Sequence, residues 1–233
     1  MNLATTEDAS TEPEFAVALR EPWLVVSFGA VVRAASWAIV GGGLVNTRRV
    51  VWLQVTNDDL RPPMDPRVFF AERLDGVNLA PSVGLLTSRR VGTYSDASAS
   101  EGSVRARCIA TVGLGNALRV GDPPWDPARV STINVLVHAS VPLSDEALLE
   151  ASALASEAKC AAMLEQPLPS RVSGRTATGT GTDCIVVTCP RARRGQSTTC
   201  YSGKHTAAGA AIGQAVTRAL GAGIEAWRRE NGL

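Results

Sequence analysis

Short hydrophobic runs separated by polar turns make up most of this 233-residue chain. Six runs are rich in β-branched residues and bounded by Gly, Pro, Asn or Asp, a pattern that predicts strands. The predicted strands cover Trp23 to Phe28, Val50 to Thr56, Val83 to Thr87, Val104 to Val112, Ser131 to His138 and Asp183 to Thr188. No internal repeat of about 20 to 50 residues is visible. We therefore expect a β-sheet core rather than a repeat architecture.

The first long helix is predicted from Ser144 to about Leu164. Ser144 is a favourable N-cap, and Asp145 and Glu146 follow it, where the helix dipole stabilises acidic side chains. Small and apolar residues recur along one narrow face of this segment. That face is expected to pack closely on the sheet.

A second long helix is predicted to start near Ser202 or Thr206 and to continue through Ala219 or beyond, with Gly221 and Gly223 as potential break points. A shorter helix is predicted over Asp65 to Leu74. With strands early and the longest helices late, the pattern predicts one α+β or α/β domain with a β-sheet core and two long helices in the C-terminal half.

The domain is expected to cover residues 21–230, behind a disordered acidic tail at residues 1–20. This start resembles neither a secretory signal nor an Arg-rich transit peptide. The long apolar stretch from Trp23 to Val45 contains Arg33 and ends in three glycines. Paired strands, or a strand and turn, fit this stretch better than a transmembrane helix.

The composition excludes several classes of partner. A net charge of +1 and 45% hydrophobic residues give no electrostatic footprint for nucleic acid or an anionic membrane, so a small neutral or zwitterionic partner fits better. The five cysteines are odd in number and lack CxxC spacing. Cys184 and Cys189 would point to opposite faces of a strand, which argues against a shared zinc ion. Reduced thiols in a cytoplasmic protein are expected.

Lysine is rare in this chain, because Lys159 and Lys204 stand against 21 arginines. A retained lysine suggests a role that needs a compact ammonium. Lys159 and Glu157 lie about 200° apart around their helix and cannot pair with each other, and neither has an oppositely charged residue three or four positions away. Both must find partners outside the helix, or water.

The run from Thr178 to Asp183 alternates threonine with glycine and ends in a carboxylate. The backbone N–H groups of Gly179 and Gly181 could approach a polar ligand closely, and three hydroxyls, including those of Thr180 and Thr182, stand beside them. The run lacks the GK[ST] ending of a phosphate-binding P-loop. The alternative interpretation, which the run taken alone favours, is a flexible turn between strands.

Lys204, His205 and Thr206 lie at the expected start of the last helix. A neutral histidine there could act as a general base, and a lysine could stabilise developing negative charge. A single histidine at the start of a helix is more often a cap than a base. His138 ends an apolar strand, which predicts a structural role.

Six motifs together resemble the adenosylcobinamide amidohydrolases over about Trp23 to Ala219. They are Gly84-Leu-Leu-Thr87, Thr111-Val-Gly-Leu-Gly-Asn116, Thr132-Ile-Asn134, Ala155-Ser-Glu-Ala-Lys159, Thr178-Gly-Thr-Gly-Thr-Asp183 and Gly203-Lys-His-Thr206. This chain has Ser131 where the family usually has glycine. The resemblance implies a cytoplasmic corrinoid-salvage enzyme that hydrolyses the aminopropanol amide of adenosylcobinamide to give adenosylcobyric acid, with the corrinoid as substrate and no separate cofactor or metal.

Two mechanisms fit this implied activity. In one, Asp183 or His205 activates a water, while Lys204 and the N–H groups of Gly179 or Gly181 hold the oxyanion and Glu157 with Lys159 completes an ionic network. In the other, Thr180 or Thr182 is a nucleophile activated by a lysine. Asn116 and Asn134 are candidates for binding the corrin's peripheral amides. The alternatives in function are a corrinoid-binding or delivery protein without catalysis, and a hydrolase of another amide.

Overall fold

The computed structural model describes residues 14–125 and 131–233. The strands are β1 (Ala16–Arg20), β2 (Trp23–Ser36), β3 (Gly43–Gln54), β4 (Val83–Thr87), β5 (Ser95–Glu101), β6 (Val104–Val112), β7 (Ala117–Leu118), β8 (Ile133–Ala139), β9 (Gly179–Thr180) and β10 (Cys184–Pro190). The helices are α1 (Pro66–Gly76), α2 (Asp145–Glu165) and α3 (Ala207–Glu230), with short 3-10 turns at Asp58–Leu60 and Val91–Thr93. All six predicted strands and all three predicted helices are confirmed.

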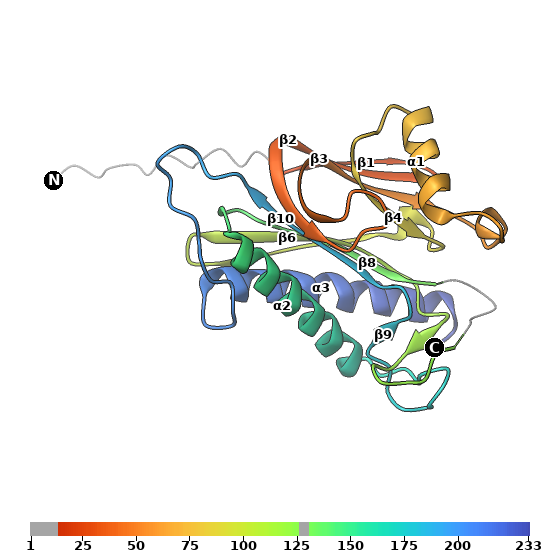
Figure 1. Cartoon of the computed structure of the whole chain (residues 1–233). Coiled ribbons are helices and arrows are strands. Elements are labelled where there is room, and N and C mark those ends of the chain that lie inside the picture. The colour runs from red at the N-terminus through yellow and green to blue at the C-terminus, as the bar shows by residue number, and fades with distance from the viewer. Residues whose placement is uncertain (1–13, 126–130) are drawn as a thin grey trace.

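Eight strands form one mixed sheet, and seven of them follow the order β4-β3-β2-β10-β8-β6-β5. The eighth strand, β1, pairs with the first part of β2, on the same side of β2 on which β10 pairs with its last part. The β3–β4 and β10–β8 pairs are parallel, and the other pairs are antiparallel. The register of β2 against β3 shifts between Ser27 and Val32. Because such an irregularity increases strand curvature, β2 bends strongly along its length (Figure 1).

The bent sheet brings its two halves face to face. One buried cluster joins Leu24, Trp52 and Leu85 from the β2-β3-β4 half to Ile109 and Leu136 from the other half. Outside these halves, α1 packs against β2 and β3, while α2 and α3 cover β10, β8, β6 and β5 (Figure 1). The molecule therefore has helices outside and an apolar seam between the sheet halves. The expected single α+β domain with a sheet core and two long C-terminal helices is confirmed.

The N-terminal boundary of the ordered domain differs from the prediction. The predicted tail includes residues 16–20, yet they form β1 against Trp23–Ser27 of β2, and Phe15 is buried beside Phe28 and His138. Strand pairing and burial of one aromatic ring order this segment, which its local composition does not indicate. The predicted tail at residues 1–13 lies outside the described residues.

The last helix is continuous through Gly221 and Gly223 and ends at Glu230, well beyond Ala219. A Cβ on Gly223 would lie 2.5 Å from Cγ2 of Val112, so this glycine lets the helix contact β6 closely. Burial of Leu220 and Ile224 on the same face offsets the low helix propensity of glycine. Within residues 14–125 and 131–233, no helix is long and apolar enough to cross a membrane.

His138 has a structural environment, as predicted. It is buried beside Phe15 and Phe28, and its Nδ1 lies 3.0 Å from Oγ1 of Thr188. Burial lowers the pKa of His138 from 6.5 to about 4. Between these values the unfolded chain binds the proton and the folded protein does not, so the free energy of unfolding should rise with pH across this window.

We expect this histidine to cost up to about 3 kcal/mol of stability as the pH falls from about 7 to 4. Denaturant unfolding of wild type and His138→Leu at several pH values measures that contribution. The variant should have a flatter pH dependence, because leucine cannot bind the extra proton on unfolding. An identical slope in both proteins would contradict the assignment.

Candidate functional site

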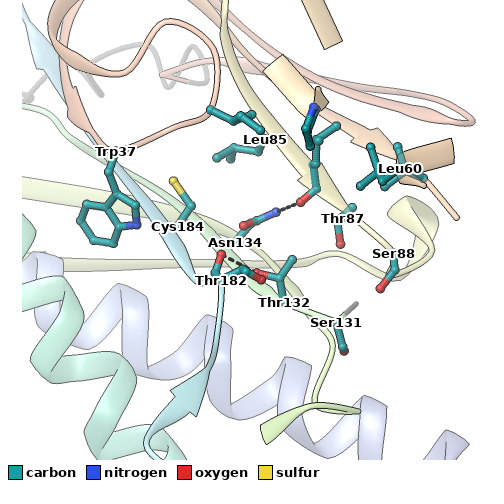
Figure 2. Close-up of a pocket in the computed structure, with 14 residues that line it drawn as sticks. Trp37, Leu60, Leu85, Thr87, Ser88, Ser131, Thr132, Asn134, Thr182 and Cys184 are labelled. Carbon is teal, nitrogen blue, oxygen red and sulfur yellow. Dashed lines mark hydrogen bonds between the residues drawn. The ribbon is translucent and has the colours of Figure 1, made fainter. Parts of the chain in front are cut away.

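A cavity of about 450 Å³ opens at one end of the seam between the sheet halves. It lies where β4 ends and where β8 and β10 begin (Figure 2). The lining residues are Trp37, Ile39, Val55, Leu60, Pro66, Leu85, Leu86, Thr87, Ser88, Ser131, Thr132, Asn134, Thr182 and Cys184. Residues from the β2–β3 connection, the β4 end and the 179–183 loop thus meet around one space.

Hydrogen bonds across the seam hold this cavity together. Nδ2 of Asn134 donates to the carbonyl of Leu86 at 2.7 Å, which joins β8 to β4. Oγ1 of Thr132 donates to the carbonyl of Thr182 at 2.9 Å and so fixes the 179–183 loop against β8 (Figure 2). The polar side of the cavity is therefore built from bonded side chains.

Asp183 is the centre of a second cluster, on the α2 side of β10. Its carboxylate accepts hydrogen bonds from the backbone N–H of Thr180 at 3.0 Å and of Ile133 at 3.1 Å, from the Thr180 hydroxyl, and from the Lys159 ammonium. The side chains of Lys159 and Asp183 are 14% and 9% exposed. Because a carboxylate offers about four acceptor positions, these four donors occupy all of them.

Gly179 is required for the close approach of this ion pair. A Cβ on Gly179 would lie 2.2 Å from both Nζ of Lys159 and Oδ2 of Asp183. At Gly181, by contrast, the nearest atom to a Cβ would be Cδ1 of Leu118 at 3.4 Å, which is ordinary contact. Close packing therefore requires glycine at the first glycine position of the Thr-Gly-Thr-Gly-Thr-Asp run but not at the second.

The cavity and the Asp183 cluster share one short segment. Thr182 and Cys184 line the cavity, while the Asp183 side chain between them turns toward α2. This alternation is the period-two geometry of an extended chain. The Asp183 carbonyl also accepts a hydrogen bond from Nε1 of Trp37 at 2.7 Å. Ligand contact with the cavity wall can therefore affect the segment that carries Asp183.

A separate surface groove lies between α2 and the turn before α3. Its lining includes Glu150, Glu157, Tyr201, Lys204, His205 and Thr206, and among the described residues it shares none with the cavity. Lys204 pairs with Glu157 at 2.5 Å, and these side chains are 65% and 58% exposed. Exposed pairs of this kind contribute little to stability. Lys204 and His205 precede the helix, because Thr206 is the N-cap and accepts a bond from the N–H of Gly209 at 2.9 Å.

Asn116 and Thr178 lie next to the small β7–β9 sheet. Asn116 is buried, and within the described part of the chain its Oδ1 has no hydrogen-bond partner. Such an atom is costly unless something binds it. Thr178 instead exchanges bonds with the β7 end, since its N–H donates to the Leu118 carbonyl and its Oγ1 accepts from the N–H of Val120, each at 2.9 Å.

The comparisons with known proteins place the chain in a family. A model of the adenosylcobinamide amidohydrolase family matches residues 6–232. The adenosylcobinamide amidohydrolase of Methanosarcina mazei is 31% identical over 172 residues, which are 70% of this chain and 76% of that protein. The chain belongs to the adenosylcobinamide amidohydrolase family.

Solved structures give weaker likenesses. The PH0078 protein of Pyrococcus horikoshii OT3 has a TM-score of 0.45 and 12% identity, covering 93% of this chain and 83% of its own. A beta-aminopeptidase of a Burkholderia species has a TM-score of 0.42 and 13% identity, covering 87% of this chain and 77% of its own. These similarities say nothing about the chemistry of the site.

In this member of the adenosylcobinamide amidohydrolase family, the motif residues fall into distinct groups. Lys159 and Glu157 find partners outside their helix, as predicted, but the partners differ: Asp183 for Lys159 and Lys204 for Glu157. The expected single ionic network is therefore divided into a largely buried pair and an exposed pair. Asn134 and Thr182 join the cavity instead.

Sequence reasoning missed Trp37 and Thr132 as parts of the site. Trp37 follows β2 in a stretch whose pattern indicates only hydrophobicity, and its bond to Asp183 spans 146 positions of sequence. The Thr132-Ile-Asn134 motif indicates no role for Thr132, although its hydroxyl fixes the 179–183 loop. The signal for Trp37 was a large aromatic residue beside a glycine-rich turn.

Among the described residues, no group of three or more His, Cys, Asp or Glu is arranged to hold a metal ion.

Proposed function

We propose that this protein hydrolyses the amide bond between aminopropanol and the corrin side chain of adenosylcobinamide, giving adenosylcobyric acid for corrinoid salvage. The main support is the family match over residues 6–232. A second support is that the motif residues Lys159, Thr180 and Asp183, from separate segments, meet in one cluster beside a cavity. Amide hydrolysis needs an activated nucleophile, a stabiliser for the oxyanion and a proton for the leaving amine.

The hydrogen bonds of Asp183 favour Thr180 as the nucleophile. All four acceptor positions of the carboxylate are occupied, so an incoming water has no free oxygen lone pair to which it can donate. Thr180 already donates its hydroxyl proton to Asp183. We assign Asp183 as the group that accepts this proton when Oγ1 of Thr180 attacks the amide carbon.

The proposed reaction then has two steps. Attack forms a C–O bond to Thr180, and the C–N bond breaks as Asp183 returns the proton to the leaving aminopropanol. Water then hydrolyses the corrinoid ester on Thr180 and restores the hydroxyl. Lys159 supplies positive charge beside the reacting groups, where a developing oxyanion is stabilised.

Thr180→Val tests the nucleophile, because it removes the hydroxyl and nearly preserves side-chain volume. We expect turnover to fall at least ~1,000-fold, while Thr180→Ser keeps measurable activity. Acid quenching of the wild-type reaction, followed by mass spectrometry, should detect corrinoid covalently bound to the peptide that contains Thr180. Turnover of Thr180→Val within about tenfold of wild type would instead establish a water nucleophile.

We place His205 and Lys204 outside the reacting centre, as parts of a groove that contacts the periphery of the substrate. The expected result for His205→Gln is therefore turnover within about tenfold of wild type and an unchanged pH profile. A general base normally contributes about 100- to 10,000-fold. A loss of that size, together with disappearance of the acidic limb of kcat/KM, would restore His205 to the role of base.

The function itself is tested by incubating adenosylcobinamide with purified, EDTA-treated protein and analysing the products by mass spectrometry. Adenosylcobyric acid and aminopropanol in equal amounts, formed without added metal, are expected. Tight binding of intact substrate would identify a corrinoid carrier. Neither binding nor turnover would direct the search to a different amide.

A further inference from the structure

The cavity in the seam has a lining that carries no formal charge. None of its fourteen lining residues is Asp, Glu, Lys, Arg or His, and burial raises the pKa of the Cys184 thiol to about 12, so this group is neutral at physiological pH. A charged ligand group loses favourable hydration when it enters the cavity, and an uncharged lining does not offset that free-energy cost. The chemistry of the lining therefore selects a neutral ligand group.

The two sides of the cavity differ in polarity. Figure 2 shows Trp37 and Cys184 on one side and the hydroxyl-bearing Thr87, Ser88 and Ser131 on the other. Leucine, isoleucine, valine and proline side chains complete the apolar part. A matching ligand has a flat apolar part and a part with several hydrogen-bonding oxygens or nitrogens.

Trp37 is a ready stacking surface. The residue is 53% exposed, which is unusual for tryptophan. The hydrogen bond from its indole N–H to the Asp183 carbonyl fixes the ring against rotation. A fixed and exposed aromatic ring loses little conformational entropy when a second flat ring stacks on it.

The volume of the cavity limits its occupant. Sites for drug-sized ligands have volumes of about 300–1,000 Å³, and about 450 Å³ lies toward the lower end. This space suits a nucleoside but not the corrin macrocycle with its side chains. The aminopropanol arm is small and flexible, and it has no flat ring to use the Trp37 face.

From these observations we infer that the seam cavity binds the 5′-deoxyadenosyl group of adenosylcobinamide, with adenine stacked on Trp37 and the ribose near the hydroxyl-bearing wall. The inference rests on the proposed function for the identity of the substrate. It also places the corrin beside Thr182, in the same loop as Thr180 and Asp183. Binding of the nucleoside would thereby position the amide-bearing side of the corrinoid at the reacting groups.

The test measures binding of 5′-deoxyadenosine alone by isothermal titration calorimetry, so it requires no turnover. We expect saturable binding to wild type, at least about fivefold weaker binding to Trp37→Ala, and binding within about threefold of wild type for Trp37→Phe, which keeps an aromatic face. Leu149→Ala, an exposed apolar residue on α2 away from the cavity lining, is the matched control and should bind as wild type.

A second measurement compares adenosylcobinamide with cyanocobinamide, which lacks the nucleoside. The preference of wild type for the adenosyl compound, as a ratio of Kd values, should fall at least about fivefold in Trp37→Ala. The inference is overturned if 5′-deoxyadenosine shows no saturable binding up to its solubility limit. It is also overturned if Trp37→Ala binds 5′-deoxyadenosine and adenosylcobinamide as wild type does, or if 1-amino-2-propanol displaces the nucleoside at equal concentration. If the protein hydrolyses adenosylcobinamide but gives any of these results, only the adenosyl assignment is wrong. If it binds the nucleoside but does not hydrolyse adenosylcobinamide, the proposed activity is wrong.

Discussion

Asp183→Asn should reduce turnover at least ~100-fold and also lower stability, because an amide cannot replace this carboxylate. One carboxylate oxygen accepts from Lys159 and the N–H of Thr180, and the other accepts from the Thr180 hydroxyl and the N–H of Ile133. In either orientation of the asparagine, its NH₂ group must face a backbone N–H. An unsatisfied buried donor costs about 1–3 kcal/mol, and the amide cannot accept the Thr180 proton.

Steady-state kinetics with saturating adenosylcobinamide and thermal unfolding measure these two effects separately. Asp122→Asn is the matched control, because Asp122 also accepts bonds from a backbone N–H and a hydroxyl, those of Arg119 and Ser170, but lies outside the Lys159 cluster. The control should keep wild-type turnover. A folded Asp183→Asn protein with turnover within tenfold of wild type would remove Asp183 from the mechanism, and failure to fold at any temperature would make it structural.

Gly179→Ala is expected to lower both stability and turnover. The added methyl group would occupy the space that Nζ of Lys159 and Oδ2 of Asp183 share, 2.2 Å from each atom. The ion pair must then separate, or β9 must move away from β7, with which it pairs at Leu118. We expect a loss of about 1–3 kcal/mol in stability, as for overpacking elsewhere, and a large loss of turnover because Lys159 and Thr180 leave their common partner.

Gly181→Ala is the matched control for Gly179→Ala. A methyl group there makes ordinary contact with Leu118, so the melting temperature should stay close to that of wild type. Equal destabilisation by both alanine variants would show that the loop needs glycine for backbone flexibility. A destabilised Gly179→Ala protein beside a stable Gly181→Ala protein would show that the close approach of the ion pair is the reason.

The local elements could be predicted because their signals are local. β-Branched runs identified six strands, and Ser144 with the following acids identified the start of α2. The missed β5 has the sequence Ser-Asp-Ala-Ser-Ala-Ser-Glu, whose small polar residues carry no strand signal. It is a strand because it pairs along β6 and α3 covers it. Packing decided this element, not intrinsic propensity.

The candidate residues could also be identified, but not their grouping. Helical geometry excluded a Glu157–Lys159 pair, which was confirmed, yet it could not assign the partners, because Asp183 is 24 and Lys204 is 47 positions away from the helix residue that it contacts. Trp37 illustrates the same limit at a separation of 146 residues. Such pairings depend on how the sheet bends, and no short sequence window contains that information.

The sequence by itself determined the family, the order of the elements and the residue types that the chemistry requires, because motifs, hydrophobic periodicity and caps act over a few neighbouring residues. The tertiary structure alone decided that β2 bends, that its bend closes two sheet halves over an uncharged cavity, and that Lys159 joins Asp183 while Lys204 stays at the surface. The physical reason is that burial and long-range hydrogen bonding are properties of the assembled fold. They select among partners that the local sequence leaves equivalent.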